Sequence, residues 1–88
     1  MKDTILYIDD ERGNLDTFWV VFHEEYELLL AKSAAEGYKL MERHEIKVAI
    51  VDQRMPQEDG IKFISNVKTK YPNVVYMILS GYADFDIA

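Results

Sequence analysis

The 88-residue chain contains no cysteine, so it cannot form a disulfide, bind a metal through thiolates or use a cysteine nucleophile. Glycine and proline are also scarce, and no Gly/Ser-rich linker or internal repeat divides the chain. No apolar run approaches the roughly 20 residues that span a bilayer, and the N-terminus lacks the charged-then-apolar layout of a signal peptide. We therefore expect one cytoplasmic domain over residues 1–88, with no membrane partner.

Positive charge is in the minority, with 10 Lys and Arg residues against 16 Asp and Glu residues and a net charge of −6. An acidic surface repels phosphate backbones and anionic lipid headgroups. This composition argues against direct binding of nucleic acid. The apolar share of 49% is that of an ordinary folded chain.

Short, almost wholly apolar runs predict four strands buried on both faces, as in a parallel sheet. They are Ile5 to Ile8, Tyr26 to Ala31, Val48 to Val51 and Val74 to Leu79. Segments with helical periodicity lie between them. Because long crossovers favour parallel pairing, the order βαβαβαβ predicts an α/β fold with an open, doubly wound sheet of strand order 2-1-3-4.

Each predicted helix has its own signal. Leu15, Phe18, Trp19 and Phe22 repeat at helical spacing, and we interpret them as a core-facing stripe. Ser33 to Glu36 form a capping-box pattern that opens a second helix. Phe63, Ile64, Val67 and Tyr71 form the stripe of a third helix, which Pro72 is expected to end.

Carboxylates follow two of the predicted strands. Asp9 and Asp10 come directly after Ile8, Asp52 follows Val51, and Ser80 follows the fourth strand. In open α/β sheets, ligands bind beyond the carboxyl ends of the strands, so neighbouring first and third strands would bring these groups together. Carboxylates about 4 Å apart repel by roughly 4 kcal/mol at an effective dielectric near 20. The cluster therefore predicts a retained proton or a hard cation such as Mg²⁺, and phosphate chemistry.

The chain resembles the receiver domain of two-component response regulators, with its flavodoxin- or CheY-like fold. Three motifs carry the resemblance: Ile5 to Glu11, with its Asp-Asp-Glu end; Val51 to Gly60, which contains Met55-Pro56 and Asp59-Gly60; and Met77 to Ala83. All three lie at the ends of predicted strands, in the family's order. Met55-Pro56 and Asp59-Gly60 should shape the loop after Asp52, with Gly60 supplying backbone freedom and Asp59 capping the helix that follows.

The resemblance implies a role for each matching residue. Asp52 would accept a phosphoryl group from a sensor histidine kinase or a phosphotransfer protein. Mg²⁺ would be held by the side chains of Asp10 and Asp52, by Asp9 through water, and by the backbone carbonyl of Arg54. Ser80 would be the switch hydroxyl that turns toward the phosphoryl group. The family is a signalling family, so we expect no enzyme beyond slow self-dephosphorylation.

The chain also departs from the family pattern after its fourth predicted strand. It stops at Ala88, within what should be a fourth helix, and the family's fifth strand and last helix are missing. With them go the switch lysine and the aromatic partner, because Lys62, Lys68 and Lys70 fall on the third helix. We expect a fragment in preference to a chain completed by another copy. In either case we expect self-association through an exposed fourth strand or a swap.

Other readings stay open at this point. A receiver fold without a working switch could be an assembly or dimerisation module. A Mg²⁺-dependent phosphohydrolase with an Asp nucleophile is disfavoured, because haloacid-dehalogenase-like enzymes carry a second acid where this chain has Arg54. The run Ser80 to Asp84, which contains Tyr82, resembles the form seen in some receivers joined to cyclic-dinucleotide phosphodiesterases or other output domains. His23 and His44 are read as surface residues.

Overall fold

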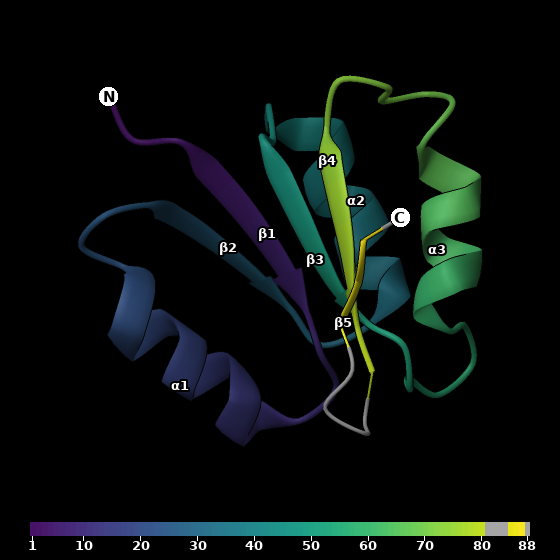
Figure 1. Ribbon diagram of the computed structural model, residues 1–88, viewed down its shortest axis with the longest axis horizontal. Coiled ribbons are helices and arrows are strands. Elements are labelled where there is room, and N and C mark those ends of the chain that lie inside the picture. Colours follow the sequence, from purple (N-terminus) through teal and green to yellow (C-terminus); the bar gives the residue numbers. More distant parts are fainter. Residues whose placement is uncertain (81–84, 88) are drawn as a thin grey trace.

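The structure is a computed structural model that describes residues 1–80 and 85–87, and it has a twisted sheet with helices on both faces (Figure 1). The parallel strands are β1 (Thr4–Ile8), β2 (Glu27–Ala31), β3 (Val48–Asp52) and β4 (Val75–Leu79). The helices are α1 (Arg12–Phe22), α2 (Ala34–Arg43) and α3 (Gly60–Val67). A short strand, β5 (Phe85–Ile87), pairs antiparallel with β4.

The strand order is β2-β1-β3-β4-β5, so the predicted order 2-1-3-4 is confirmed for the parallel strands. The register matters for function. Ile8, the last residue of β1, pairs with Ala31 on one side and with Val51 on the other. The residues that follow Ile8 and Val51 therefore leave the sheet at neighbouring points of its carboxyl edge.

Alternate residues of β1 show which helix covers which face. The ring of Tyr7 packs on Phe18 of α1, with 4.6 Å between ring centroids, whereas the Ile8 side chain reaches Gly37 of α2. Since successive side chains of a strand point to opposite faces, α1 covers one face and α2 the other. In Figure 1, α1 accordingly stands apart from α2 and α3.

The main core lies between the sheet and the α2–α3 layer. Its largest fully buried side chains are Phe63, Leu6, Ile8 and Val51. The strand β1 is apolar without a break because α1 covers it on one face and α2 on the other, and β2 and β3 flank it at its edges. The predicted parallel pairing is thus confirmed, but burial on both faces holds only for β1, because β3 and β4 alternate between buried and more exposed residues and β2 is mostly half-buried.

Local capping begins two of the helices where the sequence predicts. The Ser33 hydroxyl accepts a hydrogen bond from the Glu36 backbone N–H at 3.2 Å, and Asp59 accepts one from Lys62 N–H at 2.8 Å. Each bond satisfies a backbone donor that the first helical turn leaves free. The cap at Asp59 fixes where α3 begins, directly after the loop that follows Asp52.

Two helical predictions need correction. The α-helix α3 ends at Val67, before Tyr71, although hydrogen-bonded turns carry the chain on, with the Tyr71 N–H 2.8 Å from the Val67 carbonyl oxygen. Trp19 is 47% exposed and stacks on His23, so it is not a core residue. Helical spacing correctly placed Trp19 next to the inward-facing side of α1, but no described segment covers the Trp19 side chain.

The C-terminal segment also differs from expectation. A fourth helix was predicted there, whereas residues 85–87 form β5, which pairs with Met77, Ile78 and Leu79 of β4. Those β4 residues are therefore not an open edge, and the edge-strand reason for self-association does not hold at them. Gly81, Tyr82 and Ala83, which complete the third motif, lie outside the described residues. No helix of the described ranges is long and apolar enough to cross a membrane.

Candidate acidic site

The predicted carboxylates meet at the carboxyl edge of the sheet. Asp9, Asp10 and Asp52 each offer an oxygen, and these oxygens all lie within 4.8 Å of one another. The cause is the register described above, because Asp9 follows Ile8 while Asp52 ends the neighbouring β3. The predicted convergence is confirmed, and it gives the donor set that a hard divalent cation prefers.

Asp9 is enclosed. It is 2% exposed, and its carboxylate accepts three hydrogen bonds. The Tyr7 hydroxyl donates to Oδ2 at 2.6 Å, Asn14 Nδ2 donates to the same oxygen at 3.0 Å, and the Glu11 backbone N–H donates to Oδ1 at 2.9 Å. Burial, followed by this bond to Asp9, raises the pKa of Tyr7, so its hydroxyl remains a donor.

Tyr7 and Asn14 were missed by sequence reasoning. Tyr7 lies inside an apolar run and was read only as a strand residue. The available signal was its position two residues before Asp9, since side chains two apart on a strand point to the same side. Asn14 in the first turn of α1 carried no comparable signal, because its reach to Asp9 depends on how the helix leaves the strand.

Asp52 has a different environment, half-buried at the end of β3. Burial first, and then the negative charge of Asp9, raise the pKa of Asp52, with smaller contributions from Asp10 and Glu11. The Arg54 backbone N–H, 3.4 Å from Asp52 Oδ1, opposes this shift. The site thus penalises the ionised form of Asp52, and a bound cation would relieve that penalty.

The loop after Asp52 is tied to the sheet and to the helices beside it. The Gln53 N–H donates to the Leu79 carbonyl oxygen at 2.9 Å, and the Gln53 side chain accepts from Ile61 N–H at 2.9 Å. Farther out, the Tyr38 hydroxyl donates to Glu58 and accepts from Asn66 at 2.8 Å.

Gly60 and Gln57 have different tasks in this loop, and sequence reasoning gave Gly60 only the task of backbone freedom. Gly60 was expected to supply backbone freedom, but no described glycine has a positive φ, whereas Gln57 has a φ of 73°. Gly60 is needed instead because the start of α3 lies close to the backbone of Asp52. A Cβ atom there would lie 2.8 Å from the Asp52 carbonyl oxygen.

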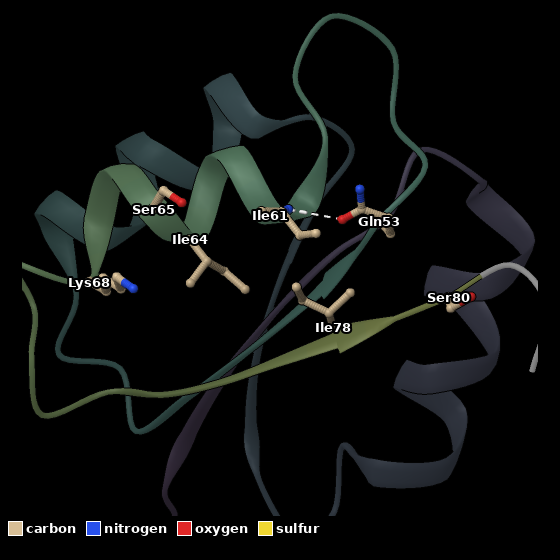
Figure 2. Close-up of a pocket in the computed structure, with 7 residues that line it drawn as sticks. All are labelled: Gln53, Ile61, Ile64, Ser65, Lys68, Ile78 and Ser80. Carbon is tan, nitrogen blue, oxygen red and sulfur yellow. Dashed lines mark hydrogen bonds between the residues drawn. The ribbon is translucent and has the colours of Figure 1, made fainter. Parts of the chain in front are cut away.

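Ser80 directly follows β4, whose last residue Leu79 pairs with Asp52. It is therefore at the same edge as the acidic cluster, as predicted. Ser80 also lies at one end of a cavity of about 390 Å³ between α3 and β4. Figure 2 shows the lining residues, which are Gln53, Ile61, Ile64, Ser65, Lys68, Ile78 and Ser80. Lys68 thus faces this cavity from the end of α3.

Known proteins share this arrangement. Residues 5–88 match the response regulator receiver domain family. The hydrogenase transcriptional regulatory protein HoxA of Bradyrhizobium diazoefficiens is 36% identical over 84 residues, which are 96% of this chain but 17% of that regulator. The chain therefore spans a small part of the curated relative's length.

Solved structures agree with the sequence match. A CheY-like receiver domain protein from Methanospirillum hungatei is 26% identical, with a TM-score of 0.89 over 96% of this chain and 68% of that one. The beryllofluoride-activated NtrC4 receiver domain, solved as a dimer, is 28% identical, with a TM-score of 0.84 over 92% of this chain and 68% of that one. The strand order, the acidic edge and the extent of the match together show that this chain belongs to the response regulator receiver domain family.

Proposed function

We propose that Asp52 accepts a phosphoryl group from the phosphohistidine of a sensor histidine kinase or a phosphotransfer protein. An Asp52 carboxylate oxygen attacks the phosphorus, the phosphorus–nitrogen bond breaks, and an acyl phosphate forms as the histidine is released. The observation that carries the proposal is the convergence of Asp52 with two further carboxylates at one sheet edge, within 4.8 Å. Membership of a signalling family supports it.

The environments of the three acids favour Asp52 as the nucleophile. Asp9 is enclosed, and three donors occupy its oxygens. Asp10 is exposed, so water competes for its oxygens. Asp52 is half-buried with a raised pKa, and a more basic carboxylate is the better nucleophile. Its Oδ1 accepts a long hydrogen bond of 3.4 Å from Arg54 N–H.

The residues fit Mg²⁺ as the cofactor. Asp10 and Asp52 would be side-chain ligands, Asp9 would act through water, and Arg54 would contribute its backbone carbonyl. All of these donors are oxygens, as Mg²⁺ requires, and few of them come from the protein, so water can complete an octahedral shell. When bound, Mg²⁺ would neutralise charge on the transferring phosphoryl group and align it.

Ser80 completes the proposal as the switch hydroxyl. It lies one residue beyond Leu79, which pairs with Asp52, and it borders the cavity next to α3. A hydroxyl there can donate a hydrogen bond to a phosphoryl oxygen on Asp52. Such a bond would form only in the phosphorylated protein, so it would bias the neighbouring loop between two arrangements.

The test is incubation of the chain with Mg²⁺ and acetyl phosphate, followed by intact-mass measurement. We expect one phosphoryl adduct on the wild-type chain, none on Asp52→Asn, and none when a chelator removes Mg²⁺. Asp16→Asn is the matched control, because Asp16 is an exposed acid on α1, paired with Arg12, and is not one of the converging carboxylates. It should retain the adduct.

The outcomes separate the rival functions. An adduct that persists in Asp52→Asn would refute the assignment of Asp52. Release of phosphate from many substrate equivalents would instead favour a phosphohydrolase. Failure of the wild-type chain to form any adduct would leave the assembly module as the better reading.

We also propose that the domain self-associates, as the sequence analysis expected, but through α1. Trp19, Val20 and Val21 follow one another in the last turns of that helix, and they are 47%, 67% and 58% exposed. A similar receiver domain has been solved as a dimer. Sedimentation over a range of concentrations should show a dimer that Val20→Glu weakens. A monomer at every concentration would contradict this proposal.

A further inference from the structure

Tyr7 carries the only hydroxyl among the residues of β1 that are fully buried. It is 4% exposed, and its ring packs on Phe18, so the side chain has little freedom to turn. The hydroxyl ends 2.6 Å from Asp9 Oδ2. A phenylalanine would fill the same space, so packing does not account for the oxygen atom.

Asn14 approaches the same carboxylate oxygen from α1. Its Nδ2 lies 3.0 Å from Asp9 Oδ2, while the Glu11 N–H lies 2.9 Å from Oδ1. An ionised carboxylate has about four acceptor positions, so these three donors leave about one, on Oδ1. Because Asp9 is 2% exposed, water cannot readily replace a lost donor.

We infer that Tyr7 and Asn14 are positioning residues that hold Asp9 in one orientation and so set the affinity and the selectivity of the acidic site for Mg²⁺. The inference rests on the proposed function, in which Asp9 takes part in a Mg²⁺ site. Groups that hydrogen-bond to metal-site residues typically change metal affinity 10–100-fold when they are removed.

Selectivity follows from the same rigidity. Mg²⁺ demands near-octahedral geometry with short bonds, whereas Ca²⁺ accepts longer bonds and more varied geometry. A carboxylate held from two elements cannot shift outward to suit the larger ion. Loss of one donor should therefore weaken Mg²⁺ binding more than Ca²⁺ binding.

The test uses Tyr7→Phe, which keeps the ring on Phe18 and removes only the donor. We expect calorimetric titration to show Mg²⁺ binding about 10-fold weaker than in the wild type, with a smaller change for Ca²⁺. Asn14→Ala should shift both constants in the same direction. No phosphoryl donor is present, so the readout is independent of phosphorylation.

Tyr76→Phe is the matched control. Tyr76 is 7% exposed, and its hydroxyl donates to the Tyr71 carbonyl oxygen at 2.9 Å, on the other side of the molecule from α1. The Tyr76→Phe variant also loses a hydroxyl from a buried tyrosine, and it should bind Mg²⁺ as the wild type does. Circular dichroism checks that each variant is folded.

Unchanged or tighter Mg²⁺ binding in Tyr7→Phe would overturn the inference, and so would equal weakening in Tyr76→Phe. If Tyr7→Phe fails to fold, Asn14→Ala decides alone, because Asn14 is exposed and its substitution leaves the core intact. A wild-type chain that binds no Mg²⁺ would instead overturn the proposed metal site, and this role with it.

Discussion

The connections that leave β1 and β3 start side by side on the sheet, but they hold their carboxylates in different ways. In the β1–α1 connection, the hydrogen bonds converge on the acid itself, since Tyr7, Glu11 and Asn14 all donate to Asp9. In the β3–α3 connection, Asp52 accepts one long hydrogen bond from Arg54 N–H, and the other bonds anchor the loop farther out, through Gln53 and Glu58.

This difference separates a fixed charge from a reactive one. Asp9 can contribute an orientation and a charge, but little of its oxygen surface is free. Asp52 is only half-buried, and its surroundings disfavour its charge. A phosphoryl acceptor needs the second arrangement, because its oxygen must reach phosphorus and later carry the phosphoryl group.

The glycines in the first turns of α1 and α3, Gly13 and Gly60, provide the strongest test of this comparison. At Gly60, a Cβ atom would press on backbone atoms of Asp52 and Gln53, at 2.8 and 3.2 Å, and backbone cannot move aside as a side-chain end can. We expect Gly60→Ala to lower the free energy of unfolding by about 2 kcal/mol, as overpacking does. Urea unfolding measures the change, and acetyl phosphate labelling should slow because Asp52 is displaced.

Gly13→Ala is the control from the other connection. A Cβ atom at Gly13 meets nothing within 4 Å, and its φ is not positive. Because alanine is the better helix former, we expect this variant to gain about 0.5 kcal/mol. If both alanine variants changed the free energy of unfolding equally, the close approach of α3 to Asp52 would make no contribution to stability.

The fold and the cluster could be predicted because their signals are short-range. Apolar runs of strand length mark β1 and β3, and parallel pairing then forces Asp9 and Asp52 to the same edge. Ser33 and Asp59 mark the starts of α2 and α3, because each side chain caps a backbone N–H three residues later. In each case the deciding interaction is local or is fixed by the strand order.

What could not be predicted depends on contacts between distant segments. Helical spacing shows which residues share a face with Trp19, but not whether another element covers that face. The backbone of Gln57 lies in the left-handed region, with a φ of 73°, and nothing in glutamine itself signals it. The antiparallel strand β5 is too short for a pattern to identify.

The final test of the comparison is the pH dependence of stability. The folded protein raises the pKa of Asp52 above its usual 3.8. At pH values between 3.8 and the folded pKa, the folded state therefore holds a proton on Asp52 that the unfolded state has already lost. Stability that depends on Asp52 must therefore fall as pH rises from 3.8 through the folded pKa, which is opposite to the usual carboxylate behaviour. Above that window the penalty is constant.

Asp52→Asn keeps the shape of the side chain and removes the charge, so it should be more stable than the wild type at neutral pH. The difference between the two should close as pH falls toward 3.8, when unfolding is followed by urea titration in a Mg²⁺-free buffer. Saturating Mg²⁺ should also reduce the difference at neutral pH, because the ion would stabilise the folded wild-type chain by binding it. A difference that stays the same at every pH would mean that the surroundings of Asp52 tolerate its charge as well as water does, and the contrast with Asp9 would then be one of hydrogen bonding alone.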